Sequence, residues 1–247
     1  MNMEKYVLIT GASSGIGRAT AIRLSKSYPL ILGGRDEKRL EETRAMCENT
    51  DTHLLWPYDL ANVNGIAENL SSLLKENGVS VGGFVHSAGI APLAPLRMTT
   101  TEQMRAIMDV NFFSAAELVK LLTNKKINGK SLTRVVLISS IQSRIGAKGQ
   151  SVYCASKAAM EGFTRAMAVE LAPNVNLNVI RPGAIQTPMG DLLQRNQELL
   201  AKPTDDGYLL GLGETEDIAS MTEFLLSENA KWMTGQIFTV DGGRCAH

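Results

Sequence analysis

Tyr153 and Lys157 are the residues of this sequence whose types and spacing best suit acid–base chemistry. They are four positions apart in a stretch that favours a helix, so their side chains are expected on one helix face, one turn apart. An ordinary tyrosine has a pKa of about 10 and holds its proton too tightly for proton transfer near neutral pH. An ammonium group about 4 Å away, at an effective dielectric constant of about 20, favours the phenolate by about three pK units. The spacing therefore predicts that Lys157 lowers the pKa of Tyr153 and makes it a general acid.

Ser140 is the third candidate, because it follows an apolar run. Residues Val135–Ile138 form a short run that is rich in β-branched residues and bounded by polar ones, which is typical of a buried strand in a parallel sheet. Ser140 would then lie at the carboxyl end of that strand, where it can donate a second hydrogen bond to the substrate oxygen that Tyr153 protonates. The alternative is that the Tyr-x-x-x-Lys spacing is an accident of a helix surface, and these residues alone do not exclude it.

A glycine-rich turn near the start of the chain is typical of a phosphate-binding site. The segment Gly11–Gly17 lies between a predicted strand at 6–10 and a helix that runs to about residue 27. Such a turn brings backbone N–H groups and the positive end of a helix dipole against a phosphate, and glycines are needed where no Cβ fits. The spacing G-x-x-x-G-x-G differs from the commoner G-x-G-x-x-G, but its position between strand and helix favours nucleotide binding.

Polar residues after the next two predicted strands would contact the adenosine part of that nucleotide. Arg35 follows the strand at 30–32, where an arginine accommodates a 2′-phosphate and an acidic residue would select NAD. Asp36 is expected to cap the next helix, so Arg35 favours NADP(H), with NAD(H) as the alternative cofactor. The other interpretation of Arg35 is a solvated loop charge. Asp59 ends the strand at 53–58 and would accept from the adenine amino group or cap a helix.

The rest of the chain alternates strand patterns with helix patterns. A capping box at Thr100 and Gln103 starts a long helix, in whose apolar middle Asn111 is expected to be buried and hydrogen-bonded. His86, after the fourth strand, is expected to be packed and hydrogen-bonded rather than catalytic. Strands are predicted at 81–85, 135–138, 177–180 and 237–240, and helices at 37–48, 63–77, 101–126, 151–171 and from a cap at Thr215.

This alternation predicts an α/β fold, namely a single-domain doubly wound parallel sheet of the Rossmann-like kind over residues 1–247. Its ligand crevice is expected at the carboxyl ends of the strands, where the glycine turn, Arg35 and Ser140 would meet. Residues 184–213 are the least regular part of the chain and are expected to form a substrate-covering loop.

Composition bounds the partners of the protein. Lys plus Arg and Asp plus Glu both number 25, so the formal net charge is zero, and neither nucleic acid nor an anionic membrane is expected as a partner. The three cysteines are far apart with no CxxC, and the three histidines are equally scattered, so neither a disulfide framework nor a metal site is expected. No apolar run is long enough for a signal sequence or a membrane span. These features predict a cytoplasmic protein that acts on a small molecule.

In order and spacing these motifs resemble the short-chain dehydrogenase/reductase family of the classical type, from Thr10 to Gly243. The resemblance aligns four residues with the catalytic tetrad of that family, namely Asn111, Ser140, Tyr153 and Lys157. Together the residues and the resemblance assign cofactor contacts to Gly11, Ser13, Ser14, Gly15, Ile16, Gly17, Arg35, Asp59, Leu60, Ala88, Gly89, Lys157, Pro182, Gly183, Ile185 and Thr187.

The resemblance implies hydride transfer between a nicotinamide cofactor and a carbonyl compound or a secondary alcohol. Tyr153 would give a proton to the oxygen, Ser140 would polarise it, and Lys157 would bind the nicotinamide ribose. Asn111 would hold a water molecule that relays protons from solvent. A homo-oligomer, either a tetramer or a dimer, is also implied, assembled through the helices predicted at 101–126 and 151–171.

Two positions depart from the family pattern. His86-Ser87 stands where the family usually has Asn-Asn, and Ser14 occupies a position that is often Arg or Lys in members that prefer NADP. The leading hypothesis is an NADP(H)-dependent reductase of a ketone, an aldehyde or a 3-oxoacyl thioester. One alternative is an NAD-dependent alcohol or sugar dehydrogenase of the same family, and the other is a catalytically silent nucleotide-binding sensor. Residues 184–213 contain no charge cluster or aromatic cage that names a substrate.

Overall fold

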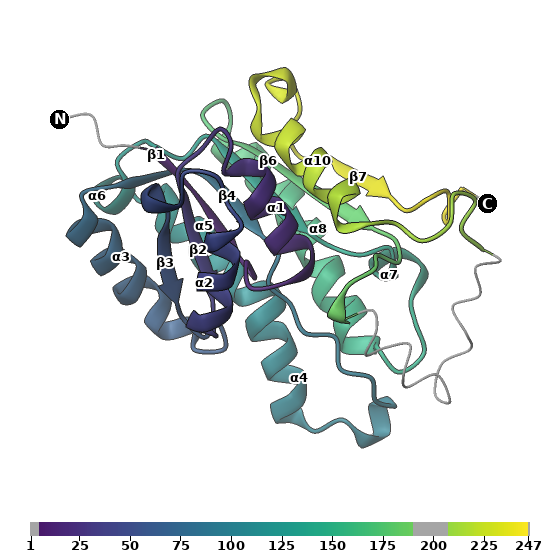
Figure 1. Ribbon diagram of the computed structural model, residues 1–247. Coiled ribbons are helices and arrows are strands. Elements are labelled where there is room, and N and C mark those ends of the chain that lie inside the picture. Colours follow the sequence, from purple (N-terminus) through teal and green to yellow (C-terminus); the bar gives the residue numbers. More distant parts are fainter. Residues whose placement is uncertain (1–4, 190–206, 247) are drawn as a thin grey trace.

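The computed structural model describes residues 5–189 and 207–246 and contains a central sheet of seven strands (Figure 1). The strand order is β3-β2-β1-β4-β5-β6-β7, and every neighbouring pair is parallel. The strands are β1 (Lys5–Thr10), β2 (Leu30–Gly34), β3 (Leu54–Pro57), β4 (Ser80–His86), β5 (Arg134–Ile138), β6 (Asn176–Pro182) and β7 (Ile237–Val240).

Helices cover both faces of this sheet. On one face α1 and α10 pack side by side, together with α2, and on the other lie α3, α5 and α8 (Figure 1). The helices are α1 (Gly15–Leu24), α2 (Glu37–Ala45), α3 (Ile66–Asn77), α4 (Thr101–Met108), α5 (Ser114–Thr123), α6 (Lys125–Asn128), α7 (Gln142–Ile145), α8 (Ser151–Leu171) and α10 (Thr215–Leu226). The predicted doubly wound α/β fold is confirmed.

Alternate residues of the inner strands enter two different cores, which explains why these strands are apolar throughout. On β5, Val135 and Leu137 join the core that α5 and α8 cover, whereas Val136 and Ile138 join the core beneath α1 and α10. All four side chains are at most 4% exposed. Burying a side chain of this size contributes about 1.5–3 kcal/mol. Packing from both sides therefore fixes β5, and with it the polar residues at its carboxyl end.

Polar residues set where several helices begin. Thr100 and Gln103 form the predicted capping box, in which each side chain accepts a hydrogen bond from the backbone of the other residue. Asp36 caps α2, as predicted. The predicted cap at Thr215 is wrong by one position, because Glu214 is the N-cap of α10 and Thr215 is its first residue.

The long helix predicted at 101–126 is interrupted in its middle. A π-helical turn occupies Asp109–Phe113 between α4 and α5, and Asn111 lies inside it and is buried. A π-turn inserts an extra residue into the helical repeat, which turns the following side chains relative to the preceding ones, and such turns are frequent at functional sites. Apolar periodicity in the sequence continues across the insertion, so the pattern predicted one unbroken helix.

The loops after β1, β4, β5 and β6 meet at one edge of the sheet. β1 and β4 are neighbours, yet the chain leaves β1 toward β2 on one side and leaves β4 toward β5 on the other. This is the topological switch point of the sheet, the place where open α/β folds bind ligands. Thr10 and His86, the last residues of β1 and β4, are paired there.

Residues 190–206 of the predicted substrate-covering loop lie outside the described residues. In the described part of that loop, Ile185 and Gly213 form an isolated parallel bridge. The single domain over residues 1–247 stays a prediction. Within residues 5–189 and 207–246, no helix combines the length and apolar character needed to cross a bilayer, and no three His, Cys, Asp or Glu side chains in those ranges gather as a metal site requires.

Candidate active site

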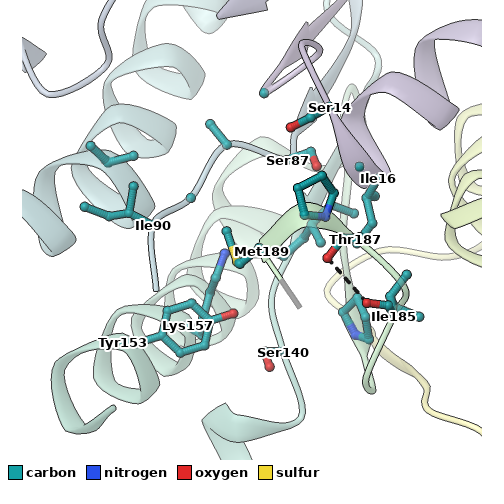
Figure 2. A pocket seen from close by; sticks show the side chains of 18 of the residues that line it. Ser14, Ile16, Ser87, Ile90, Ser140, Tyr153, Lys157, Ile185, Thr187 and Met189 are labelled. Atoms are coloured by element: carbon teal, nitrogen blue, oxygen red, sulfur yellow. Dashed lines mark hydrogen bonds between the residues drawn. The ribbon is translucent and has the colours of Figure 1, made fainter. Parts of the chain in front are cut away.

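A cleft of about 950 Å³ opens at the carboxyl edge of the sheet, over the switch point. Of the predicted site residues, all but Gly17 and Asn111 line it. Figure 2 shows Ser14 and Ile16 on the glycine turn, Ser140 after β5, and Tyr153 and Lys157 on α8 around this space. The predicted site residues that line the cleft are Gly11, Ser13, Ser14, Gly15, Ile16, Arg35, Asp59, Leu60, Ala88, Gly89, Ser140, Tyr153, Lys157, Pro182, Gly183, Ile185 and Thr187.

The glycine turn has the shape that a pyrophosphate needs. Gly11 has a left-handed φ of +71°, and a Cβ at this position would lie 2.7 Å from the Ala88 nitrogen. A Cβ on Gly17 would collide with the carbonyl oxygen of Gly11, so Gly17 keeps α1 close to β1 rather than lining the cleft. The Ser14 side chain does not cap α1, which leaves the first N–H groups of this helix for a ligand. These features fit a dinucleotide.

Two arginines lie at the adenosine end of the cleft, Arg35 directly after β2 and Arg39 in the first turn of α2. Arg35 and Arg39 are both exposed and both line it. Asp36 lies between them in sequence, and its side chain accepts a hydrogen bond from the Arg39 nitrogen at 3.1 Å as the cap of α2. Asp59 also lines the cleft, where its Oδ1 atom accepts from the Ala61 nitrogen at 3.0 Å. No pattern in the sequence pointed to Arg39, although it lies one helical turn beyond Arg35.

Tyr153 and Lys157 lie at the opposite end of the cleft, and burial governs the ionisation of both. Burial raises the pKa of Tyr153 to about 12, although the hydrogen bond with the Ser140 hydroxyl acts to lower it. Burial lowers the pKa of Lys157 to about 8. The Lys157 Nζ atom donates to the Ile138 carbonyl oxygen at 2.8 Å and lies 5.8 Å from the centroid of the Tyr153 ring.

The prediction that Lys157 brings the pKa of Tyr153 close to neutral is therefore wrong for this structure. The spacing does place both residues on one face of α8, but the ammonium group turns toward the end of β5, and the loss of solvation around the phenol is the larger effect. At neutral pH Tyr153 carries its proton and can donate it. Lys157 is for the most part charged, because its pKa of about 8 still lies above 7.

Asn111 is buried behind the cleft, and its amide is occupied by protein groups. Its Oδ1 atom accepts from the Ile90 nitrogen at 2.8 Å, and its Nδ2 atom donates to the Ile90 carbonyl oxygen and the Ser156 hydroxyl, both at 3.0 Å. This is the local satisfaction expected of a buried amide. A Cβ on Gly89 would lie 3.4 Å from both Asn111 Oδ1 and Lys157 Nζ, so Gly89 keeps these two groups close. The water relay through Asn111 stays a prediction.

His86 is fully buried between β1 and the π-turn. Its Nδ1 atom is 2.9 Å from the Thr10 hydroxyl, so the predicted packed and hydrogen-bonded histidine is confirmed. Its Nε2 atom has no partner of good geometry among the described residues, although the carbonyl groups of Val110 and Asn111 lie near it. Burial, followed by the charge of Lys157, lowers the pKa of His86 to about 3. The imidazole is therefore neutral near pH 7.

Two glutamines line the part of the cleft beyond Ser140 and Tyr153. Gln150 is 2% exposed, and neither its amide nitrogen nor its amide oxygen has a partner among the described residues. The Oε1 atom of Gln142 is likewise buried and unpaired within the described chain. Buried polar groups are nearly always hydrogen-bonded in folded proteins. No pattern in the sequence pointed to either residue, because their isolation arises only from the packing around them.

Comparison with known proteins finds matches over nearly the whole length of this chain. A family model described as Enoyl-(Acyl carrier protein) reductase matches residues 11–244. Carbonyl reductase family member 4 of Xenopus tropicalis is 32% identical over 243 residues, which covers 98% of both chains. The 3-oxoacyl-[acyl-carrier-protein] reductase FabG of Thermotoga maritima is 31% identical over 254 residues, covering 98% of this chain and 99% of that protein.

Solved structures agree with these matches. A 4-hydroxyisoleucine dehydrogenase complexed with NADH has a TM-score of 0.89 at 28% identity, and covers 98% of this chain and 99% of its own. ElxO with NADP bound has a TM-score of 0.86 at 25% identity, and covers 99% of this chain and all of its own. The two neighbours thus bind different nicotinamide cofactors in the same fold.

Proposed function

This chain belongs to the short-chain dehydrogenase/reductase family and is a nicotinamide-dependent oxidoreductase, and we propose that it uses NADPH to reduce the carbonyl group of a small molecule. One observation carries the proposal. A protonated, buried Tyr153 lies close to Ser140 at one end of a cleft whose other end is an uncapped helix N-terminus beside two arginines. The relatives named as carbonyl and 3-oxoacyl reductases support this direction.

The residues of the cleft would hold the dinucleotide along its length. The glycine turn and the first N–H groups of α1 would bind the pyrophosphate, and Arg35 and Arg39 would bind a 2′-phosphate on the adenosine ribose. Lys157 would bind the nicotinamide ribose, and Pro182–Thr187 would contact the nicotinamide amide. When bound, the reduced nicotinamide supplies a hydride to the carbonyl carbon.

The side chains of this protein would supply the proton and stabilise the negative charge that develops on the substrate oxygen. The Ser140 hydroxyl donates a hydrogen bond to the carbonyl oxygen and stabilises the negative charge that develops there. Tyr153 transfers its hydroxyl proton to the same oxygen. Because the Tyr153 pKa is about 12, the phenol is fully protonated at neutral pH and ready to donate. Alcohol oxidation would need the phenolate, so the raised pKa of Tyr153 supports reduction over the dehydrogenase alternative.

A Tyr153→Phe variant tests the enzyme against a silent nucleotide-binding sensor. General acid catalysis contributes about 10²–10⁴-fold, so NADPH consumption should fall by that factor while the affinity for NADPH is retained. Substrates for the assay come from a screen of ketones, aldehydes, sugars and 3-oxoacyl thioesters. A variant that turns over at the wild-type rate would remove Tyr153 from the mechanism.

Arg35 is the test of cofactor choice, because Ser14 lacks the positive charge often found at its position. We expect Arg35→Ala to weaken NADPH binding by about ten- to a hundredfold, since a charge-assisted hydrogen bond contributes about 1.5–3 kcal/mol. NADH binding should change little. If the wild-type enzyme used NADH as well as or better than NADPH, the assignment of Arg35 to a 2′-phosphate would be refuted and the NAD-dependent alternative favoured.

A cytoplasmic homo-oligomer remains part of the proposal. Phe113, beside α5, and Val169, on α8, are large apolar side chains with exposures of 47% and 82%. Both lie on the helices through which the family resemblance implies assembly. Light scattering coupled to size-exclusion chromatography should report a dimer or tetramer, and a charged residue in place of Val169 should shift it toward the monomer.

A further inference from the structure

Glu161 is a buried carboxylate one turn beyond Lys157 on α8, and the proposed reaction does not use it. It is 6% exposed. Arg181 donates to it from Nε at 2.9 Å and from Nη2 at 2.6 Å, and the hydroxyls of Ser139 and Ser143 donate at 2.9 and 2.5 Å. Burial raises the pKa of Glu161, but these hydrogen bonds outweigh burial and hold the pKa below its usual value. The group is therefore ionised at neutral pH.

The two serines that contact Glu161 lie on either side of Ser140. The Ser139 hydroxyl also approaches the Lys157 carbonyl oxygen at 3.2 Å, which ties the end of β5 to α8. The Ser143 hydroxyl lies 2.7 Å from the Ser140 carbonyl oxygen, and the Ser143 nitrogen donates to that oxygen at 3.0 Å. One carboxylate on α8 thus holds the backbone before and after Ser140.

Arg181 connects the Glu161 carboxylate to strands β6 and β7 of the sheet. It lies on β6, directly after the register pair formed by Ile138 and Ile180, and its Nη1 atom donates to the Thr239 hydroxyl of β7 at 3.3 Å. Its side chain is 12% exposed, and that of Glu161 is 8% exposed. A buried ion pair is weak evidence for stability, since well-packed apolar residues often replace one without loss. Apolar residues cannot replace the hydrogen bonds to the serines beside Ser140.

We propose that Glu161 and Arg181 are a positioning pair that holds the Ser140 hydroxyl within reach of Tyr153 and of the substrate oxygen. The inference rests on the proposed function, because that reaction requires Ser140 and Tyr153 to act on one oxygen. Neither Glu161 nor Arg181 lines the cleft, so both act through Ser140. Small displacements of a reacting group reduce rates strongly, even when the substituted residue is distant from the chemistry.

The first test compares Glu161→Gln with a variant in which both partners become apolar, Glu161→Leu with Arg181→Met. We expect kcat to fall by about ten- to a hundredfold in both, with the KM for NADPH within about twofold of wild type. Glu228→Gln is the matched control, because it breaks an arginine–carboxylate pair at the opposite edge of the sheet. A double variant that is as stable as wild type and fully active would show that the pair only stabilises the fold.

The second test is a double-mutant cycle with Ser140→Ala. If Glu161 acts through Ser140, Glu161→Gln should lower kcat in the wild-type background and change it by less than about twofold in the Ser140→Ala background. Equal effects in both backgrounds would overturn the inference. The inference would also be overturned if Tyr153→Phe abolished turnover while Glu161→Gln left it at the wild-type rate. The proposed function would stand in that case.

A crystal structure of Glu161→Gln gives a readout that does not depend on a known substrate. We expect the Ser140 hydroxyl to move away from the Tyr153 hydroxyl, while α1 and the glycine turn keep their positions. An unchanged contact between Ser140 and Tyr153 would contradict the positioning role. Wild-type protein that binds NADPH but reduces no carbonyl compound would count against the proposed function, and the crystal structure would still decide the role of Glu161.

Discussion

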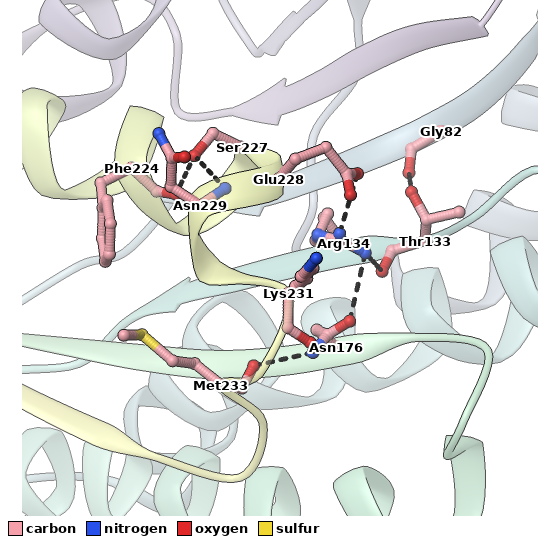
Figure 3. A network of polar contacts seen from close by, with 10 residues as sticks. All are labelled: Gly82, Thr133, Arg134, Asn176, Phe224, Ser227, Glu228, Asn229, Lys231 and Met233. Atoms are coloured by element: carbon pink, nitrogen blue, oxygen red, sulfur yellow. Dashed lines mark hydrogen bonds and ion pairs between the residues drawn. The ribbon is translucent and has the colours of Figure 1, made fainter.

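The amino and carboxyl edges of the sheet contain similar polar side chains, but these side chains have different roles. At the amino edge, Arg134 at the start of β5 donates to Glu228 at 3.0 Å and to Asn176 Oδ1 at 3.1 Å, and the Asn176 amide donates to the Met233 carbonyl at 2.9 Å (Figure 3). In this network only Arg134 Nε is buried without a partner among the described residues. At the carboxyl edge, buried atoms of Gln142, Gln150 and His86 lack partners within the described chain.

Both edges also contain an arginine–carboxylate pair, and the two pairs differ in their exposure to solvent. Glu228 is 88% exposed, so its pair with Arg134 is screened and is expected to contribute only about 0–1 kcal/mol. The Glu161 side chain is 8% exposed and shares its carboxylate between Arg181 and two serines. The amino edge closes the sheet with groups that are hydrogen-bonded apart from Arg134 Nε, whereas several buried polar atoms at the carboxyl edge have no partner among the described residues. That difference is what a binding site requires.

The largest effect that distinguishes the edges is expected from Gly11→Ala. Gly11 has a φ of +71°, and its Cβ would meet the backbone of Ala88 at 2.7–2.9 Å. The left-handed conformation costs about 1–2 kcal/mol for a residue with a Cβ, and the contact with rigid backbone adds about 1–3 kcal/mol. We expect a loss of stability of several kcal/mol, roughly 2–5, together with loss of NADPH binding. Urea unfolding and fluorescence titration with NADPH measure both.

Gly78 provides the matched control, because it is a left-handed glycine in the connection that leads into β4 at the amino edge. Its φ is +64°, and a Cβ there would have no atom within 4 Å. Gly78→Ala should therefore cost only the conformational term of about 1–2 kcal/mol and leave NADPH affinity unchanged. Equal losses of stability and binding in the two variants would contradict the distinction between a shaped cradle and an ordinary helix end.

Lys157→Met is expected to raise the stability of the fold and to lower the activity. Burial lowers the pKa of Lys157 from 10.5 to about 8, so a charged ammonium at neutral pH destabilises the fold. The variant should gain roughly 2 kcal/mol at neutral pH, after allowing for the lost hydrogen bond to Ile138. Activity should fall strongly, because the variant loses the group proposed to bind the nicotinamide ribose.

The pH dependence of unfolding checks the sign of this effect. Between the folded-state pKa of about 8 and the ordinary value of 10.5, the unfolded chain binds more protons at Lys157 than the folded chain. The free energy of unfolding contributed by this group therefore rises with pH across that window. In Lys157→Met this rise should be absent. A variant that is less stable than wild type on both sides of the window would show that the hydrogen bond to Ile138 outweighs the cost of burial.

Much of this fold could be predicted because its local signals agree with one another. The strands are apolar on both sides, as Val135–Ile138 shows, and such runs are typical of parallel sheets covered on both faces. The helix at 151–171 was predicted with the bounds that the structure gives it. The site followed from the fold, since residues after successive strands must meet at one edge.

Features that depend on burial or distance could not be read from the chain. The pKa of Tyr153 was predicted from spacing alone, whereas the desolvation that raises it follows from the packing of α8 against the ends of β5 and β6. Glu161 was inside a correctly predicted helix, but a glutamate there is ordinarily solvated. Its role emerges only when β5, β6 and α8 bring Ser139, Ser143 and Arg181 to the same carboxylate.

The smallest effect is expected from Glu228→Gln at the amino edge. The substitution removes the charge that meets Arg134 Nη2 but leaves Arg134 Nη1 bound to Asn176 and to the Thr133 carbonyl, both at 3.1 Å. Because Glu228 is 88% exposed, the free energy of unfolding should fall by less than about 1 kcal/mol, with kcat and KM unchanged. Urea unfolding at low and high salt measures the difference in stability between the variant and wild type. High salt should remove this difference, because it screens exposed charges. A loss of activity here would mean that the amino edge communicates with the cleft through β5, and the division between the two edges would have to be abandoned.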